Sequence, residues 1–318
     1  MTRPDCILQP GFRPPSFPDV TCLGSLSPAE VYTIDNPLDW DKGSEWTARA
    51  DFLSEDAVIV AISLNTLGWK SSLITNRLGN DILGENVVAE LRRLGIEGEF
   101  VLDPSIDTPY EIVISDKNGG RTYLWKRKVD VLSTMEESDL SVMTGSKFVY
   151  ADAYDWPYNA PGLKQANNLG IPVLLNMEDL AYIDKCGLDV YSIATTVQVS
   201  LTGDLSANFL FNWVDEALAF GVRDVIITRG EQGAYYISKD VRASVSAPNI
   251  NLVDANGAGA IFASGFLSGY LNNMSPTESV KFGVAVSSLS CERAGTDLPN
   301  LDKINTVFKH LKLSTLQN

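Results

Sequence analysis

The stretch that decides the fold is VDANGAGAIFASGFLSGYL, residues Val253–Leu271. It reads as the end of a strand, a turn rich in glycine and then an apolar helix that begins near Ala260. Glycines let the backbone approach an anion closely, and the amino terminus of a helix carries a partial positive charge. We therefore expect the turn around Asn256 to hold a phosphate group, although an ordinary strand-to-helix turn would show the same pattern.

A second glycine turn, TRGEQG at Thr228–Gly233, follows the apolar strand pattern DVIIT. Ligands of α/β proteins bind at the carboxyl ends of the strands. Two glycine turns at the ends of consecutive strands suit a ligand that carries several phosphates, so the pair is stronger evidence than either turn alone.

Strand and helix patterns alternate over the second half of the chain. The strand patterns are KFVYADA, PVLLNM, TTVQVSL and DVIIT, with helical patterns between them. This alternation predicts an α/β fold with a mostly parallel sheet and helices on both faces. Hairpin patterns interrupt it at about residues 25–55 and 101–130, the second around Asn118-Gly119-Gly120. We expect one domain over residues 1–318, with the two interruptions meeting in a small β-sheet lid.

Composition excludes several classes of partner. The 318 residues carry a net charge of −15 and a pI of about 4.5, which disfavours nucleic acid and anionic membranes. A single histidine, His310, makes a histidine-based triad or metal site implausible. The four cysteines lack metal-like spacing, and neither an apolar signal segment nor a membrane-length run is present. These features predict a cytoplasmic protein.

Four segments together resemble the ribokinase or PfkB family of small-molecule kinases. They are DANGAG with FASGFLSGYL, TRGEQGAYYI, SSLSCERAGT, and LITNRLGNDILGENVVAELRRLGI from Leu73 to Ile96. They occur in the family's order and span nearly the whole chain. The resemblance implies a ribokinase-like core whose β lid closes over a sugar or nucleoside, and it implies binding of ATP with Mg²⁺, with K⁺ as a further candidate.

The resemblance also assigns residues to the expected site. It implies an anion hole at Gly257, Ala258 and Gly259, and a monovalent-cation and loop-holding role for Asp254. Its implied nucleotide-binding residues are Thr228, Gly230, Gly233, Asn256 and Gly295.

The chain departs from the family pattern where the chemistry is expected. The family has an aspartate directly after Gly-Ala-Gly, which accepts the proton of the substrate hydroxyl, and this chain has Ala260. An alanine side chain accepts no proton, so phosphoryl transfer is expected to be absent or impaired. The family's Asn-x-x-Glu, which organises Mg²⁺, falls near Ser200–Gly203 and is absent, as it is in some sugar kinases of the family.

The substrate side differs as well. The family's substrate-binding aspartate falls on Ala29, unless a one-residue insertion makes Glu30 its substitute. Its Gly-Gly and following asparagine fall on Ser54, Glu55 and Ile59. The candidate substrate positions are therefore Ser27, Ala29, Glu30, Ser54, Glu55 and Ile59.

Three interpretations of Ala260 stay open. It is an engineered substitution that traps a complex, the mark of a natural pseudokinase used for binding or as a scaffold, or part of a site reshaped for another reaction. Because an exposed apolar sheet face is a liability unless it is covered, the lid is also expected to pair between subunits in a homodimer.

Overall fold

A computed structural model describes residues 17–116, 120–178, 190–201, 207–293 and 295–316. Its main element is a nine-stranded sheet of order β15-β14-β13-β12-β11-β10-β9-β1-β4. The strands are β1 Val20–Leu23, β4 Ser71–Ile74, β9 Phe148–Asp152, β10 Val173–Asn176, β11 Thr196–Ser200, β12 Asp224–Thr228, β13 Ala234–Ser238, β14 Arg242–Val245 and β15 Leu313–Thr315. Pairing is parallel from β4 to β12 and antiparallel from β12 to β15. The predicted α/β fold with a mostly parallel core is confirmed.

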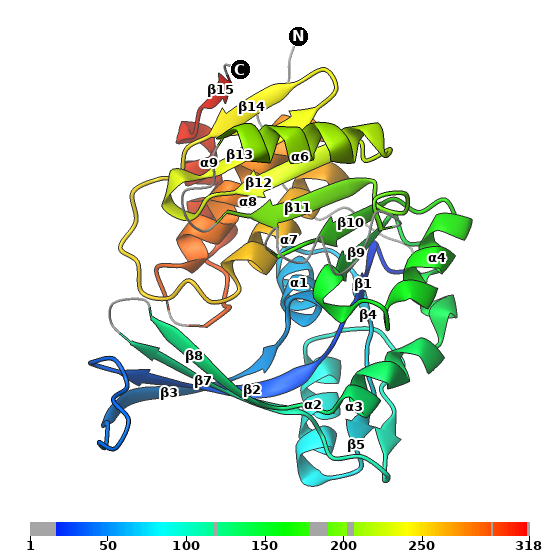
Figure 1. Ribbon diagram of the computed structural model, residues 1–318, viewed down its shortest axis with the longest axis vertical. Coiled ribbons are helices and arrows are strands. Elements are labelled where there is room, and N and C mark those ends of the chain that lie inside the picture. Colours follow the sequence, from blue (N-terminus) through cyan, green and yellow to red (C-terminus); the bar gives the residue numbers. More distant parts are fainter. Residues whose placement is uncertain (1–16, 117–119, 179–189, 202–206, 294, 317–318) are drawn as a thin grey trace.

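Helices cover both faces of this sheet (Figure 1). Side chains alternate along each strand, so Phe148 and Tyr150 join one apolar cluster while Val149 and Ala151 join the other. The first cluster contains α1 Asp56–Thr66, α2 Ile82–Arg93, α7 Ala258–Leu271, α8 Pro276–Ser290 and α9 Leu301–His310; the second contains α4 Ala160–Asn168 and α6 Ala207–Ala219.

The segment Val253–Leu271 differs in two respects from its sequence-based prediction. No strand leads into the glycine turn, because β14 ends at Val245 and a loop runs from there to Gly257. The two turns are therefore not at the ends of consecutive strands. Gly257 adopts a left-handed conformation (φ 66°) and begins α7 at Ala258, two residues earlier than expected. Glycine suits this position because other residues pay steric strain there.

The two interrupting segments form a separate four-stranded sheet of order β3-β2-β7-β8 (Figure 1). Its strands are β2 Ser27–Ile34, β3 Trp46–Ser54, β7 Tyr110–Asp116 and β8 Arg121–Lys126. The predicted hairpin is present as the antiparallel pair β7–β8. Residues 117–119 of its turn lie outside the described residues. Two short strands, β5 Leu78–Gly79 and β6 Leu102–Asp103, pair with each other near the base of this sheet.

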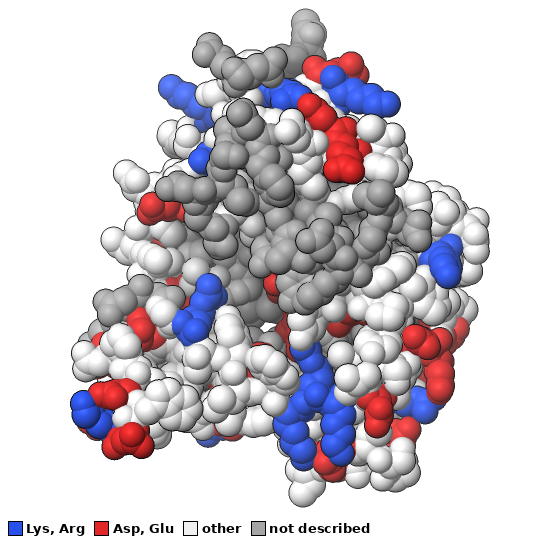
Figure 2. Space-filling model, in the orientation of Figure 1, with Lys and Arg blue, Asp and Glu red and all other residues white. Residues whose placement is uncertain are grey.

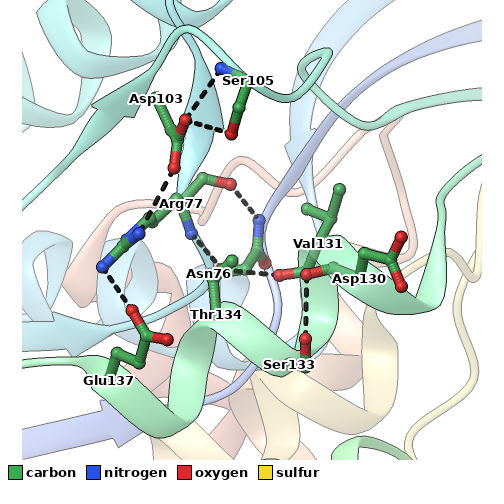
Figure 3. A network of polar contacts seen from close by, with 9 residues as sticks. All are labelled: Asn76, Arg77, Asp103, Ser105, Asp130, Val131, Ser133, Thr134 and Glu137. Carbon is green, nitrogen blue, oxygen red and sulfur yellow. Dashed lines mark hydrogen bonds and ion pairs between the residues drawn. The ribbon is translucent and has the colours of Figure 1, made fainter.

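One loop after β4 contacts two of the connections between the small sheet and the core. The Asn76 side chain accepts a hydrogen bond from the Leu26 N–H (2.8 Å) and donates to the Leu26 carbonyl (3.3 Å), between β1 and β2. It also donates to the carbonyl of Arg77 (2.9 Å). The Arg77 N–H reaches Thr134 Oγ1 (2.9 Å), and its guanidinium pairs with Asp103 and Glu137, as Figure 3 shows.

Thr134 and Glu137 belong to a short 3-10 helix, Thr134–Glu137, that follows α3 Val129–Ser133. This segment leads from β8 back to the core. The small sheet is therefore held at its base by contacts that converge on Asn76 and Arg77.

The face drawn in Figure 2 shows no continuous basic patch among the described residues. In the view of Figure 2, Lys and Arg gather only in small groups among Asp and Glu. No helix among the described residues is both long and apolar enough to cross a bilayer.

Candidate functional site

The turn at Gly257–Gly259 presents uncommitted backbone donors at the start of α7. The N–H of Ala258 bonds weakly back to the Ala255 carbonyl (3.3 Å), and no backbone carbonyl in the described chain accepts from Gly259 or Ala260. Such orphan N–H groups, together with the helix dipole, form an anion-binding site. The Ala260 side chain is fully buried in the apolar cluster that contains α1 and α8. Apolar side chains therefore surround the position at which the family pattern places a base.

Three polar contacts fix the position of this turn. Gln198 on β11 donates from Nε2 to the Gly259 carbonyl (3.0 Å). The Asp254 carboxylate accepts from the N–H groups of Asn256 (2.9 Å) and Gly295 (3.1 Å). Asp254 therefore holds together the loop before α7 and the loop after α8.

Asn256 also connects the turn to the small sheet. Its Oδ1 accepts from Arg121 Nη1 on β8 (2.7 Å), and Figure 1 shows the loop before α7 extending toward the β7–β8 end of that sheet. The contact brings the small sheet over the approach to the glycine turn. It supports the interpretation of this sheet as a lid.

The second turn follows β12. Gly230 has φ 52°, and a Cβ added there would meet nothing within 4 Å. Gly233 has φ 90°, and a Cβ there would overlap the carbonyl oxygen of Val245, so packing alone requires this glycine. Thr228 Oγ1 contacts Ser200 Oγ (2.9 Å) on the adjacent strand. Gln198 lies two residues before Ser200, which places both turns near the carboxyl end of β11.

A row of polar side chains crosses the carboxyl ends of three neighbouring strands. Asp152, Asn176 and Gln198 are successive register partners on β9, β10 and β11. Asn176 Nδ2 donates to Asp152 Oδ1 (3.2 Å) and to Asp56 Oδ2 on α1 (2.9 Å). The row leads directly to the glycine turn, because Gln198 is bonded to Gly259.

Further carboxyl groups surround this row. Asp155 accepts from the Ser25 N–H (2.7 Å), and a Cβ added at Gly24 would lie 2.9 Å from Asp155 Oδ2 and 3.1 Å from Asp152 Oδ2. Gly24 thus leaves room for two carboxylates at the end of β1. Glu55 pairs with Arg127 (2.5 Å) and accepts from Ser27 Oγ (3.1 Å).

Burial and mutual repulsion make these carboxyl groups weak acids. Burial is the main cause that raises the pKa of Glu55 to about 7. The attraction of Arg127 opposes this rise, and the charge of Asp155 adds to it. Burial and the charge of Glu178 raise the pKa of Asp56 to about 8. Burial and the charge of Asp56 raise the pKa of Asp152 well above its usual range. These raised pKa values favour the protonated, uncharged forms of the carboxyl groups over the ionised forms near neutral pH.

The structure separates the predicted substrate positions into three groups. Ser27, Ser54 and Glu55 lie beside the carboxyl group cluster, where Ser54 Oγ donates to Glu111 Oε2 (2.7 Å). Ile59 is buried, and its side chain lies 3.0 Å from where a Cβ at Gly257 would stand. It therefore packs under the turn.

Ala29 and Glu30 occupy opposite faces of β2, since side chains alternate along a strand. Ala29 shares the face of Ser27, whereas Glu30 bonds to Tyr32 and to Arg49 (2.7 Å) on the other face. Glu30 therefore faces away from the side of β2 that carries Ser27 and Ala29. Glu111 on β7, the register partner of Ala29, brings a carboxyl group to the inner face instead.

Sequence reasoning missed Asp56, Glu111, Arg127, Asp152, Asp155 and Asn176. Two of them were detectable, because Asp152 and Asn176 end the buried strand patterns FVYAD and VLLN, at the strand ends where ligands bind. The others carry no local signal, because only the tertiary structure brings them together from different elements. The Asn-x-x-Glu position cannot be placed in full, since 202–206 lie outside the described residues.

A separate pocket of about 750 Å³ at Arg223, Asp224 and Tyr236 lies at the amino end of β12, away from both glycine turns.

Comparisons with known proteins agree with this arrangement. The model of the pfkB family of carbohydrate kinases matches residues 199–303, which include both glycine turns. Fructokinase-2 of Oryza sativa is 27% identical over 271 residues, covering 74% of this chain and 78% of its own. Ribokinase of Thermotoga maritima superposes with a TM-score of 0.77 at 19% identity, over 92% of this chain and 100% of its own.

Ribokinase of Arabidopsis thaliana, in complex with ribose and ATP, superposes with a TM-score of 0.74 at 17% identity, over 92% of this chain and 99% of its own. The family match covers residues 199–303 with both glycine turns, and the structural matches, which extend over 92% of the chain, show the ribokinase-like fold.

Proposed function

We propose that this chain binds ATP with Mg²⁺ across the two glycine turns, and a sugar or nucleoside between them and the small sheet. The observation that carries the proposal is the pair of uncommitted N–H groups at Gly259 and Ala260, at the start of a 14-residue helix. A helix start of this kind favours a phosphate group. The ATP-bound ribokinase with the same fold supports the assignment of the anion to a nucleotide.

The residues present fit these cofactors to different degrees. The described residues contain no group of three acidic, histidine or cysteine side chains placed to hold a metal ion. The proposal therefore assigns Mg²⁺ mainly to the phosphate oxygens, where it neutralises charge during phosphoryl transfer. Asp254 is the proposed side chain for K⁺, although both its oxygens already accept backbone hydrogen bonds.

We further propose that phosphoryl transfer is absent or strongly impaired. Ala260 brings no proton acceptor to the start of α7, and apolar neighbours bury it. The Asp56 carboxyl group accepts a hydrogen bond from Asn176, the register partner of the Gln198 that bonds to Gly259. A natural pseudokinase and a site reshaped for another reaction are the alternatives, and the apolar packing of Ala260 favours either over a single engineered change.

The small sheet is proposed to act as a lid and as a dimer interface. All of β8 is exposed, and Tyr123, Leu124 and Trp125 are 43%, 56% and 63% accessible. An edge strand with large apolar side chains is stabilised when a second copy covers it.

Calorimetric titration with ATP and Mg²⁺ tests the nucleotide site. Gly259→Asp is the informative variant: a Cβ there meets only Gln198 Nε2, at an ordinary 3.9 Å, and an acidic residue suits the first turn of a helix. The fold is expected to persist while the new carboxylate repels phosphate and weakens ATP binding at least tenfold. Gly43→Asp, at an exposed open position, adds the same charge and should bind ATP normally. Absence of ATP binding by the unchanged chain would refute the proposal.

A further inference from the structure

Three of the connections between the small sheet and the core meet at one side chain, Glu55. This residue directly follows β3 and precedes α1. Its carboxyl group accepts a hydrogen bond from the Oγ of Ser27, the first residue of β2 (3.1 Å). It also pairs with Nη1 of Arg127, the residue directly after β8 (2.5 Å). The chain segments that cross at β2, β3 and β8 are therefore joined through a single carboxyl group.

The backbone at Glu55 is held in a strained conformation. Its φ of 84° lies in a region that suits glycine and is unfavourable for other residues. Such residues persist where the surrounding contacts fix them, and they are typical of segments that switch between conformations. Here the contacts are largely buried, because the side chains of Glu55 and Arg127 are only 19% and 10% exposed.

Arg127 connects the same point to the core. Its guanidinium stacks on the ring of Tyr154 (4.8 Å), which belongs to the 3-10 helix Ala153–Asp155 after β9. It also donates a hydrogen bond to the Tyr154 hydroxyl group. Movement of β8 away from the core would separate Arg127 from Glu55 or from Tyr154, and it would admit water to the Glu55 carboxyl group.

The Glu55 carboxyl group is a weak acid in this position. Burial raises its pKa to about 7, the attraction of Arg127 opposes the rise, and the charges of Asp155 and Glu111 add to it. Two further groups that interact with its charge are Asp56 on α1 and the Tyr154 hydroxyl group. A glutamate that reaches water has a pKa of about 4. The buried group therefore keeps a proton that an exposed one releases.

We propose that the small sheet moves against the core about Glu55, and that this movement breaks the contact with Arg127 and transfers a proton from the Glu55 carboxyl group to water. The inference rests on the proposed role of the small sheet as a lid. It adds the contact that holds the lid in place and the condition that releases it. Movement of the lid is thereby linked to pH.

The direction of the pH dependence follows from the proton count. With the sheet in place, Glu55 keeps its proton up to about pH 7, whereas the solvated group of the moved state loses it above about pH 4. Between these values a rise in pH favours the moved state, because that state binds one proton fewer. From pH 5 to pH 7 the opening equilibrium of the small sheet should increase by roughly 40-fold, as linkage of one proton between these pKa values requires.

Hydrogen exchange followed by mass spectrometry at pH 5, 6 and 7 tests the inference, with each rate divided by the intrinsic amide exchange rate at that pH. We expect β2, β3, β7 and β8 to exchange faster than β1, β9 and β10 at each pH, and to open more as pH rises. Exchange of the small sheet only together with the core would overturn both the hinge and the lid. Independent exchange that does not increase with pH would overturn the hinge alone, and neither result affects the separate titration with ATP.

Two variants of Glu55 show whether this residue carries the pH dependence. Glu55→Gln keeps the size of the side chain and does not titrate, so the opening of the small sheet should lose most of its increase with pH. Glu55→Gly also suits the φ of 84°, so the fold is expected to persist while the small sheet opens more than in the unchanged chain at pH 5.

Lys126→Gln is the matched control. It breaks the exposed ion pair between Lys126 and Asp107 (2.9 Å), next to Arg127 in the chain. Exposed pairs contribute little to stability, so this variant should open with the pH dependence of the unchanged chain. The same increase with pH in Glu55→Gln as in the unchanged chain and the control would overturn the inference.

Discussion

Replacing Asp56 by asparagine should change how the stability of this protein depends on pH. The pKa of Asp56 is raised to about 8 in the folded chain, whereas an aspartate in an unfolded chain has a pKa of about 4. Between these values the folded state holds a proton that the unfolded state has released. Unfolding therefore becomes easier as pH rises, which is the opposite of the behaviour of a salt-bridged carboxylate.

The magnitude follows from the proton count. One carboxyl group protonated only in the folded state lowers the free energy of unfolding by about 1.4 kcal/mol per pH unit inside this window. Asp56→Asn removes that contribution and also reduces the repulsion felt by Asp152 and Glu178. The slope between pH 5 and pH 7.5 should become less negative by about 1 kcal/mol per pH unit, somewhat below the full value because both states are partly protonated at the ends of this range, and the variant should be the more stable protein at pH 7.5.

Urea unfolding followed by tryptophan fluorescence at several pH values in this range measures the slope. Asp240→Asn, which changes an exposed carboxyl group, is the control and should reproduce the slope of the unchanged chain. Stability of the unchanged chain that rises steadily from pH 5 to pH 7.5, or an identical slope for Asp56→Asn, would show that the carboxyl groups are not buried together as described.

Four further predictions follow from particular contacts. Gly24→Ala places a Cβ 2.7 Å from a neighbouring alanine and should lower the free energy of unfolding by about 1–3 kcal/mol, measured in urea against Gly43→Ala at an open position. Asn76→Ala removes the contacts at the base of the small sheet and should increase hydrogen exchange there more than in the nine-stranded sheet; equal exchange would contradict the anchoring role. Ala260→Asp should raise ATP consumption by about 10²–10⁴-fold with a suitable sugar or nucleoside if the base alone is missing, and silence across the panel would favour a pseudokinase. Light scattering at micromolar concentration should show a dimer that Trp125→Glu dissociates, and a monomeric unchanged chain would exclude the interface.

Local sequence was sufficient for the elements and for the fold class. The buried strands, the hairpin β7–β8 and the helix after Gly257 all depend on patterns within about ten residues, which is the range over which strand and helix periodicity acts. The glycine turns were visible for the same reason. The prediction of a strand before Gly257 was wrong because Leu252 and Val253, although apolar, are exposed in a loop. Apolar side chains at these two positions do not indicate a buried strand.

Only the tertiary structure could determine the chemistry of the substrate side. The sequence left Ala29 and Glu30 as alternatives, and the pairing of β2 with β3 and β7 places them on opposite faces of the small sheet, because strand register fixes which face each side chain occupies. Asp56, Asp152 and Asp155 are separated by up to about a hundred residues in the chain but share one site. Their raised pKa values arise from burial and from each other's charge, and both are properties of proximity in space that no local pattern records.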